Sequence, residues 1–152
     1  MSKPHPTELV PDAAFEALVR SICRRPGMYV QEPYFESVSA YLQGYDAANF
    51  GGPLLGFHQL LVLEGGGADN IGWPGNVRRL IGASHGPLSD EVAVAKLGEV
   101  ILDFIAYRRA NGLTKIFYDY GKCLLRKSSY SGPLRSSPAS RSTRARAKSA
   151  SS

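Results

Sequence analysis

The stretch SDEVAVAKLGEVILDFIAYRRANG, residues 89–112, decides the fold class because it has the pattern of one long helix with both ends marked. Ser89 is a preferred N-cap residue, and the two acidic residues that follow it suit the positive end of a helix dipole. At the other end, two arginines precede Gly112, which is a common helix terminator. The spacing predicts a helix whose buried stripe is Leu97, Val100, Ile101, Phe104 and Tyr107.

Helical spacing recurs on the N-terminal side of this stretch. Residues 12–25 place apolar side chains at i, i+3, i+4 and i+7 before a Pro-Gly stop, and residues 35–50 repeat the pattern. Residues 53–63 are apolar nearly all round, which is typical of a central, buried helix. These three segments are therefore predicted to pack around the long helix.

The segments after residue 63 are shorter or more ambiguous. A glycine-rich loop is expected at residues 64–76, followed by a short helix near residues 77–81. Residues 114–125 form a last amphipathic segment, for which a helix fits the spacing and a strand at residues 115–120 is the alternative. The sequence therefore predicts an all-α fold, a single compact bundle of five or six helices.

The formal net charge of +5 lies entirely near the C-terminus. Residues 1–127 contain 13 basic and 13 acidic residues, whereas residues 128–152 contain five basic residues, no acid and ten serines. Such a segment cannot bury enough apolar surface to offset the entropy of ordering it. We expect a flexible segment at 1–11, a helical domain at 12–130 and a disordered Ser/Arg-rich tail at 131–152.

The sequence contains no pattern that favours a membrane location. The N-terminal segment MSKPHPTELVPD does not resemble a signal peptide. The longest apolar run, near residues 54–63, is about ten residues, half of what a membrane span needs. We expect a cytoplasmic protein without a membrane partner.

The residues that could carry chemistry do not cluster in the sequence. Cys23 and Cys123 form no CxxC pair, and His58 lies on an apolar run, where a role in the core is the simpler interpretation. Cys23 and His58 could meet as a nucleophile and its base, but no spacing indicates that they do. The glycine run at 65–67 is neither a Walker loop nor a GxGxxG motif. We expect no catalytic residue, no metal site and no cofactor, and therefore not an enzyme.

RRPGMYV, residues 24–30, resembles a short motif of the gyrase-type ATPase domain. In that family a helix with a catalytic Glu and a magnesium-binding Asn follows the motif. Here the next helix offers Glu36 and Asn49, which are thirteen residues apart and cannot form that pair. We interpret the match as coincidental and the stretch as a turn, with Met28 and Tyr29 folding back onto the core.

The order of several motifs resembles a second family, one of small bacterial proteins similar to the immunity proteins that are encoded beside toxins and neutralise them. The motifs are RRPGMYV (24–30), LQGYDAAN (42–49), GFHQLLVL (56–63), DNIGWPGN (69–76) and GLTKIFYDYGKCLLRKSSYSGPLR (112–135). The resemblance implies a protein that binds a cognate toxin and blocks it stoichiometrically, through surface contacts rather than catalysis.

Exposure and residue type suggest which residues would contact such a partner. Asp69, Asn70 and Trp73 lie among glycines in the predicted loop, and Trp73 is the single tryptophan of the chain. A loop Trp either packs onto the core or serves as an anchor for a partner, and the sequence leaves both alternatives open. Arg25 and Tyr29 are the next candidates.

Two other functions remain open at this point. The basic tail predicts weak, salt-sensitive binding of polyanions, which would make the protein nucleic-acid-associated. Alternatively, the helical domain binds a small ligand near His58 and Tyr41.

Overall fold

The structure is a computed structural model that describes residues 12–65 and 68–129. These residues form six α-helices and one 3-10 turn, without a β-strand among them, so the all-α prediction is confirmed. The elements are α1 (Asp12–Arg24), η1 (Pro26–Met28), α2 (Phe35–Ala48), α3 (Phe57–Leu63), α4 (Trp73–His85), α5 (Asp90–Asn111) and α6 (Leu113–Ser129). The segments predicted to be flexible at 1–11 and disordered at 131–152 lie outside the described residues.

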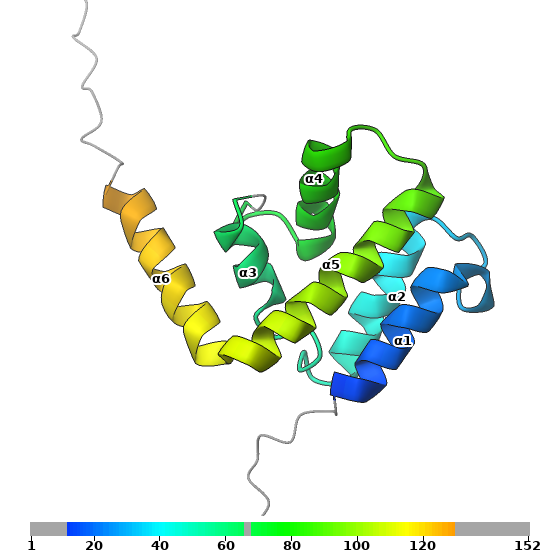
Figure 1. The fold of residues 1–152 in the computed structure, drawn as a ribbon, viewed down its shortest axis with the longest axis horizontal. Helices are drawn as coiled ribbons and strands as arrows, with labels where there is room; N and C mark the ends of the chain where they lie inside the picture. Colours follow the sequence, from blue (N-terminus) through cyan, green and yellow to red (C-terminus); the bar gives the residue numbers. More distant parts are fainter. Residues whose placement is uncertain (1–11, 66–67, 130–152) are drawn as a thin grey trace, which may run out of the picture.

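α5 is the central element, and it touches α1, α2, α3, α4 and α6 (Figure 1). Its ends are those that the sequence predicts. The Ser89 hydroxyl oxygen accepts a hydrogen bond from the Val92 backbone N–H at 3.4 Å, and Gly112 ends the helix with a φ of 80°. That positive φ strains any residue with a side chain, so glycine is required where the chain turns from α5 into α6.

The hydrophobic core lies between α5 and the first four helices. α1 and α2 bury their apolar faces on one side of α5, and α3 and α4 bury theirs on the other. The large side chains that are fully enclosed are Phe15, Phe35, Phe57, Phe104, Ile22, Leu42, Leu97, Ile101, Ile105 and Ile116. Of these ten, nine belong to α1, α2, α3 and α5, and only Ile116 comes from α6.

Arg108 ties the C-terminal end of α5 to two other parts of the chain. Its guanidinium donates to the backbone carbonyls of Gly52 at 3.2 Å and Leu55 at 3.1 Å, and to the Asp12 carboxylate at 2.7 Å. Because Arg108 is only 9% exposed, these partners satisfy a charge that would otherwise be costly to bury. The α2–α3 loop and the start of α1 are thereby fixed to α5.

Two predicted boundaries are wrong and one ambiguity is resolved. The apolar segment at 53–63 is buried as expected, but α3 begins only at Phe57 because Gly56 has a φ of 89°, outside the helical region. α4 begins at Trp73, so the glycine-rich loop is shorter than predicted. Residues 115–120 are helical and belong to α6. None of the described helices combines the length and the apolar character that crossing a bilayer requires.

Candidate functional site

α6 is attached to the rest of the molecule mainly by its first turns. A Cβ placed on Gly56 would lie 3.0 Å from Leu113 and 3.6 Å from Ile116, so the α6 side chains pack directly against the backbone before α3. Ile116 is fully buried there, and it is the buried residue of α6 within the described chain. The remainder of this helix runs along α3 at the edge of the molecule (Figure 1).

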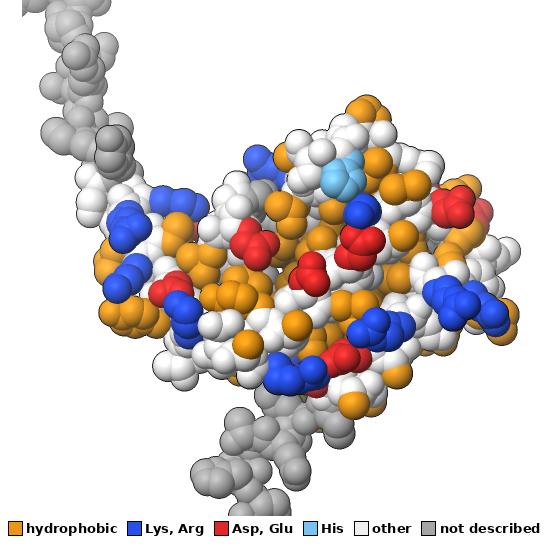
Figure 2. Space-filling view, in the orientation of Figure 1, with side chains coloured by type: hydrophobic (Ala, Val, Ile, Leu, Met, Phe, Trp, Pro, Cys, Tyr) orange, Lys and Arg blue, Asp and Glu red, His pale blue; other side chains and the backbone are white. Residues whose placement is uncertain are grey.

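The outer face of α6 carries a row of large exposed apolar side chains, which we call the outer row. It consists of Phe117 (40% exposed), Tyr118 (62%), Leu124 (37%) and Leu125 (70%). Figure 2 shows hydrophobic and basic side chains next to one another over this helix. An exposed apolar group of this size on a well-formed helix is typical of a surface that another molecule covers.

A polar cluster, the Asp69 cluster, lies between α6 and the loop before α4. The Tyr120 hydroxyl donates a hydrogen bond to Asp69 Oδ1 at 2.7 Å. His58 Nε2 and Lys127 Nζ each lie 4.0 Å from the same carboxylate. The hydrogen bond to Asp69 is the main cause that raises the pKa of the Tyr120 phenol above its ordinary value. The cluster connects α3, the loop and the middle of α6.

On its other side, α6 forms one wall of an open hollow of about 530 Å³, the α3–α6 groove. The α6 wall consists of Asp119, Lys122, Cys123 and Arg126, and the opposite wall and floor consist of Leu60, Leu63, Glu64 and Tyr107. Figure 2 shows hydrophobic side chains between α6 and α5, with basic side chains over α6 and acidic ones toward α3 and α5. Burial and the neighbouring Asp103 carboxylate raise the pKa of the Glu64 carboxyl above its ordinary value.

The charges divide at the α5–α6 turn. Residues 1–112 contain nine basic and twelve acidic residues, a net charge of −3, whereas residues 113–152 contain nine basic residues and one acid, a net charge of +8. The balance found over residues 1–127 is therefore an average over two unlike parts. α6 alone has Lys115, Lys122, Arg126 and Lys127 against Asp119, a net charge of +3.

Of the residues predicted from the loop, the structure brings Asp69 next to α6 and places Trp73 elsewhere. Trp73 is the first residue of α4 and is half-buried, with its ring centroid 5.5 Å from that of Phe57. Of the two alternatives for this Trp, the structure therefore shows the tucked one. Asn70 is exposed at the turn beside Asp69.

A buried asparagine, Asn76, holds this loop in place. Its amide oxygen accepts from the Ala68 backbone N–H at 2.9 Å, and its amide nitrogen donates to the carbonyls of Ala68 at 3.1 Å and Ile71 at 3.2 Å. Fully buried polar groups are stable only when bonded in this way. No pattern in the sequence indicates this role of Asn76.

Arg25 and Tyr29 lie at the C-terminal end of α1, at the opposite end of the molecule from α6 (Figure 1). Arg25 is exposed, whereas the Tyr29 hydroxyl donates to Ser21 Oγ at 2.6 Å and its ring packs edge-on against Tyr41 at 5.7 Å. Met28, expected to fold onto the core, is 78% exposed, because the 3-10 turn after Pro26 directs it outward. The five predicted contact residues therefore do not form one surface.

Cys23 and His58 have different neighbours in the structure. Cys23 packs against Gly98 of α5, and a Cβ added to Gly98 would lie 2.9 Å from the Cβ of Cys23. Burial raises the pKa of the Cys23 thiol to about 11. His58 instead faces Asp69, and Tyr41, the residue predicted to share a ligand with it, packs against Tyr29. Within residues 12–65 and 68–129, no group of three or more His, Cys, Asp or Glu side chains could hold a metal ion.

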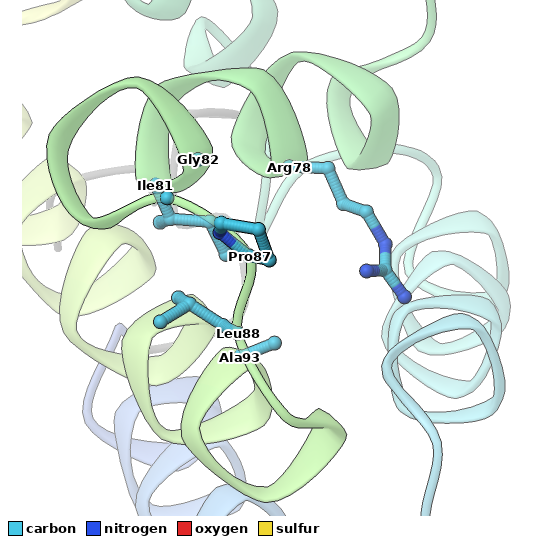
Figure 3. Close-up of a pocket in the computed structure, with 7 residues that line it drawn as sticks. Arg78, Ile81, Gly82, Pro87, Leu88 and Ala93 are labelled. Atoms are coloured by element: carbon cyan, nitrogen blue, oxygen red, sulfur yellow. The ribbon is translucent and has the colours of Figure 1, made fainter.

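A second hollow, of about 380 Å³, lies between α4 and the start of α5 (Figure 3). Its lining is apolar apart from Arg78, whose guanidinium points away toward α2. That group is bonded to Glu36 at 2.6 Å and lies 3.5 Å from Asp90, which also caps α2 by accepting from the Phe35 N–H at 3.1 Å. The hollow thus lies beside a structural ion-pair network, and it offers less for recognition than the surroundings of α6.

The exposure of the outer row was not predicted from the sequence, although the spread of apolar residues around this helix indicates it. At 100° per residue, the apolar positions Ile116, Leu124 and Leu125 spread over about half of the helix circumference, more than one packing face covers. A helix with such a spread either is enclosed on two sides or keeps one apolar side exposed. The structure shows the second arrangement.

Comparison of the chain with protein-family models, with curated proteins and with solved structures found no match.

Proposed function

We propose that this protein acts in the cytoplasm by binding another protein, with α6 as its main contact surface, and that it neutralises a cognate toxin by stoichiometric contact. The observation that carries the proposal is the outer row of α6. Its four large apolar side chains remain accessible although the same helix is held to the body by Ile116 and Tyr120. Surfaces of this kind are typical of partner recognition.

The nature of the contact surface favours a protein partner over a reaction. Cys23 is enclosed against α5 with an elevated thiol pKa, which opposes thiolate formation and hence nucleophilic attack. His58 and Tyr120 both contact Asp69, and the three side chains hold α6 against the loop before α4. These groups have structural partners, whereas each side chain of the outer row of α6 leaves between 37% and 70% of its surface exposed.

The toxin as partner comes from the resemblance to immunity-type proteins. Under this proposal Asp69 and Asn70 extend the surface formed by α6, because the Asp69 cluster joins their loop to that helix. Arg25 and Tyr29 would form a separate contact at the far end of α1. Trp73 supports the surface from within by packing on Phe57.

The experiment is co-expression of the chain with the toxin encoded beside its gene, scored by growth rescue. Rescue and a purified complex of 1:1 stoichiometry are expected. A matched pair of variants locates the surface: Leu125→Ser removes a 70% exposed side chain of the outer row, and Met28→Ser removes a 78% exposed one at η1. Loss of rescue in the first and retention in the second support the proposal, and absence of rescue with folded protein present contradicts it.

A second candidate function rests on the α3–α6 groove, which would bind a small cationic, partly apolar ligand. The supporting observation is Glu64, whose exposed side chain lies at the apolar floor of the groove and near Asp103, so that an incoming cation would relieve the repulsion between the two carboxylates. Titration with an alkylamine, followed by NMR, should shift groove resonances in the wild type and leave them unchanged in Glu64→Gln. Shifts of equal size in both proteins would exclude this candidate.

A further inference from the structure

The outer face of α6 has the geometry of a docking surface for another helix. Phe117 and Leu124 are one heptad apart and form one ridge, and Tyr118 and Leu125 form a parallel ridge with the same spacing. A line of small residues, Thr114, Gly121 and Ser128, runs between the ridges, and a Cβ added at Gly121 would meet nothing within 4 Å. Two apolar ridges with a shallow line between them accept the side chains of one facing helix.

Basic side chains flank both ridges. Lys122 Nζ lies 4.4 Å over the Tyr118 ring, at the edge of the second ridge. Lys115 lies one heptad earlier on the same side, where it is paired with Asp119 at 2.7 Å. Lys127 flanks the first ridge near Asp69. Lys127 is close to Asp69 and Lys115 to Asp119, whereas Lys122 lies over Tyr118 and α6 as a whole has a net charge of +3, which favours a partner helix with negative charge beside its apolar seam.

We propose that α6 docks an acidic amphipathic helix of a partner protein, with the partner's apolar side chains lying between the Phe117–Leu124 and Tyr118–Leu125 ridges. This inference rests on the proposed function and adds the surface and the chemistry of the partner. The apolar ridges supply the buried area, and the flanking lysines supply the sign of the charge that the partner must carry. Helix-in-groove recognition of this kind uses anchors at one-turn and two-turn spacing.

The charges argue against the other occupants of this face. A second copy would bring one α6 of net charge +3 against another, and residues 130–152 of the same chain carry five basic residues and no acid. An anionic bilayer would match the charge of α6. A helix that lies on a bilayer, however, needs apolar residues along the middle of its contact face, and the middle of this face consists of Thr114, Gly121 and Ser128. A facing helix fits both the charge and the shape.

The test uses the full chain and two synthetic three-heptad peptides with Leu at a and d, one with Glu and one with Lys at e and g. Binding is measured by fluorescence anisotropy and its stoichiometry by calorimetry. We expect the Glu peptide to bind 1:1, with an affinity that falls as salt is added, and the Lys peptide to bind at least about tenfold more weakly. Equal binding of the two peptides, or none, overturns the proposal.

Matched variants localise the binding. Tyr118→Ser combined with Leu125→Ser should weaken the Glu peptide about tenfold or more, whereas Met28→Ser combined with Phe50→Ser, at positions 78% and 99% exposed, should change nothing. Circular dichroism confirms that each variant is folded. An equal effect of both pairs overturns the proposal.

A second set of variants tests the charge of the surface. Lys122→Glu combined with Lys115→Glu should reverse the preference between the two peptides. Arg24→Glu combined with Arg79→Glu, at exposed positions of α1 and α4, is the control. Dimerisation of the free chain that Leu125→Ser abolishes would identify a second copy as the occupant and overturn the proposal. So would flotation with phosphatidylcholine–phosphatidylserine vesicles that depends on Leu125. If toxin rescue survives in the Tyr118→Ser, Leu125→Ser variant, neutralisation of the toxin stands, but α6 is not its contact surface and the docking proposal is wrong.

Discussion

α1 and α6 are both amphipathic helices, yet they use their apolar faces in opposite ways. α1 has 13 residues and buries Phe15, Val19 and Ile22 completely against α5. α6 has 17 residues and buries only Ile116 completely, while four large apolar side chains stay exposed. An amphipathic pattern therefore predicts a helix with a covered face, but the pattern does not indicate which molecule covers that face.

The cause of the difference is where each helix lies relative to α5. α1 lies beside α5, so that every turn of its apolar face meets the core. α6 begins directly after α5, and the turn at Gly112 directs it away from α5, so that only its first turns reach the core (Figure 1). Later turns of α6 have α3 on one side and solvent on the other.

The largest expected effect comes from a matched pair of Phe→Ala substitutions. Phe104 of α5 is 1% exposed and its ring lies 4.9 Å from that of Phe57, so Phe104→Ala should lower the free energy of unfolding by ~3–5 kcal/mol. Phe117 is 40% exposed, so Phe117→Ala should cost only about 1–2 kcal/mol. Urea unfolding of both variants measures the difference. Similar losses would mean that the outer row of α6 is part of the core.

The two cysteines report separately on the two regions. Because the pKa of the buried Cys23 thiol is raised from 9.0 to about 11, its thiolate population at pH 8 should be lower by roughly a hundredfold. Both cysteines are half-buried, but Cys23 packs against Gly98 of α5, whereas Cys123 of α6 lines the open α3–α6 groove. Labelling with Ellman's reagent should show one fast thiol and one that reacts much more slowly until the protein is unfolded. A fast phase that persists in Cys123→Ser would contradict this assignment.

A matched pair of glycines should give stability changes of opposite sign. In Gly98→Ala the new Cβ would lie 2.9 Å from Cys23 Cβ, so α1 must shift from α5 at a net cost of about 1–2 kcal/mol. Gly121 of α6 faces open space, and Gly121→Ala should gain about 0.5–1 kcal/mol of helix propensity. Thermal unfolding measures both. A loss in Gly121→Ala would show that something already occupies that face.

The sequence predicts the core of the fold well because local signals and burial agree there. The Ser89 cap, the Gly112 stop and the stripe of Leu97, Ile101 and Phe104 are all present in α5. The helix expected at 53–63 begins later because Gly56 has a positive φ, at a place where an added Cβ would also lie 3.0 Å from Leu113 of α6. Such a requirement arises from tertiary packing and leaves no periodic signal.

The candidate site was harder to predict because its members come together from distant positions. Asp69 was predicted from its loop, but its partners Tyr120 and Lys127 lie on α6 and its neighbour His58 on α3. Arg108 is one of the two arginines that the sequence predicts to interact with the helix dipole, whereas in the structure it donates a hydrogen bond to the α2–α3 loop. Neither arrangement follows from spacing along the chain, since each depends on where α5 and α6 place their side chains.

The smallest expected effect concerns the bond that holds the middle of α6. Tyr120→Phe removes the hydrogen bond to Asp69, and because this site is half-exposed the loss of stability should be about 1 kcal/mol or less. The bond raises the pKa of the phenol, so its contribution is complete below the ordinary phenol pKa of about 10 and is lost as the pH rises through the higher value of the folded protein.

Absorbance at the phenolate band, measured as wild type minus Tyr120→Phe, isolates the titration of this tyrosine. Its midpoint should lie above the ordinary phenol value and should move toward that value in Asp69→Asn, which removes the charge of the acceptor but keeps its size. An ordinary midpoint in the wild type would mean that the Asp69 bond does not hold α6. The helix would then be attached by its first turns alone, and the contrast with α1 would be sharper still.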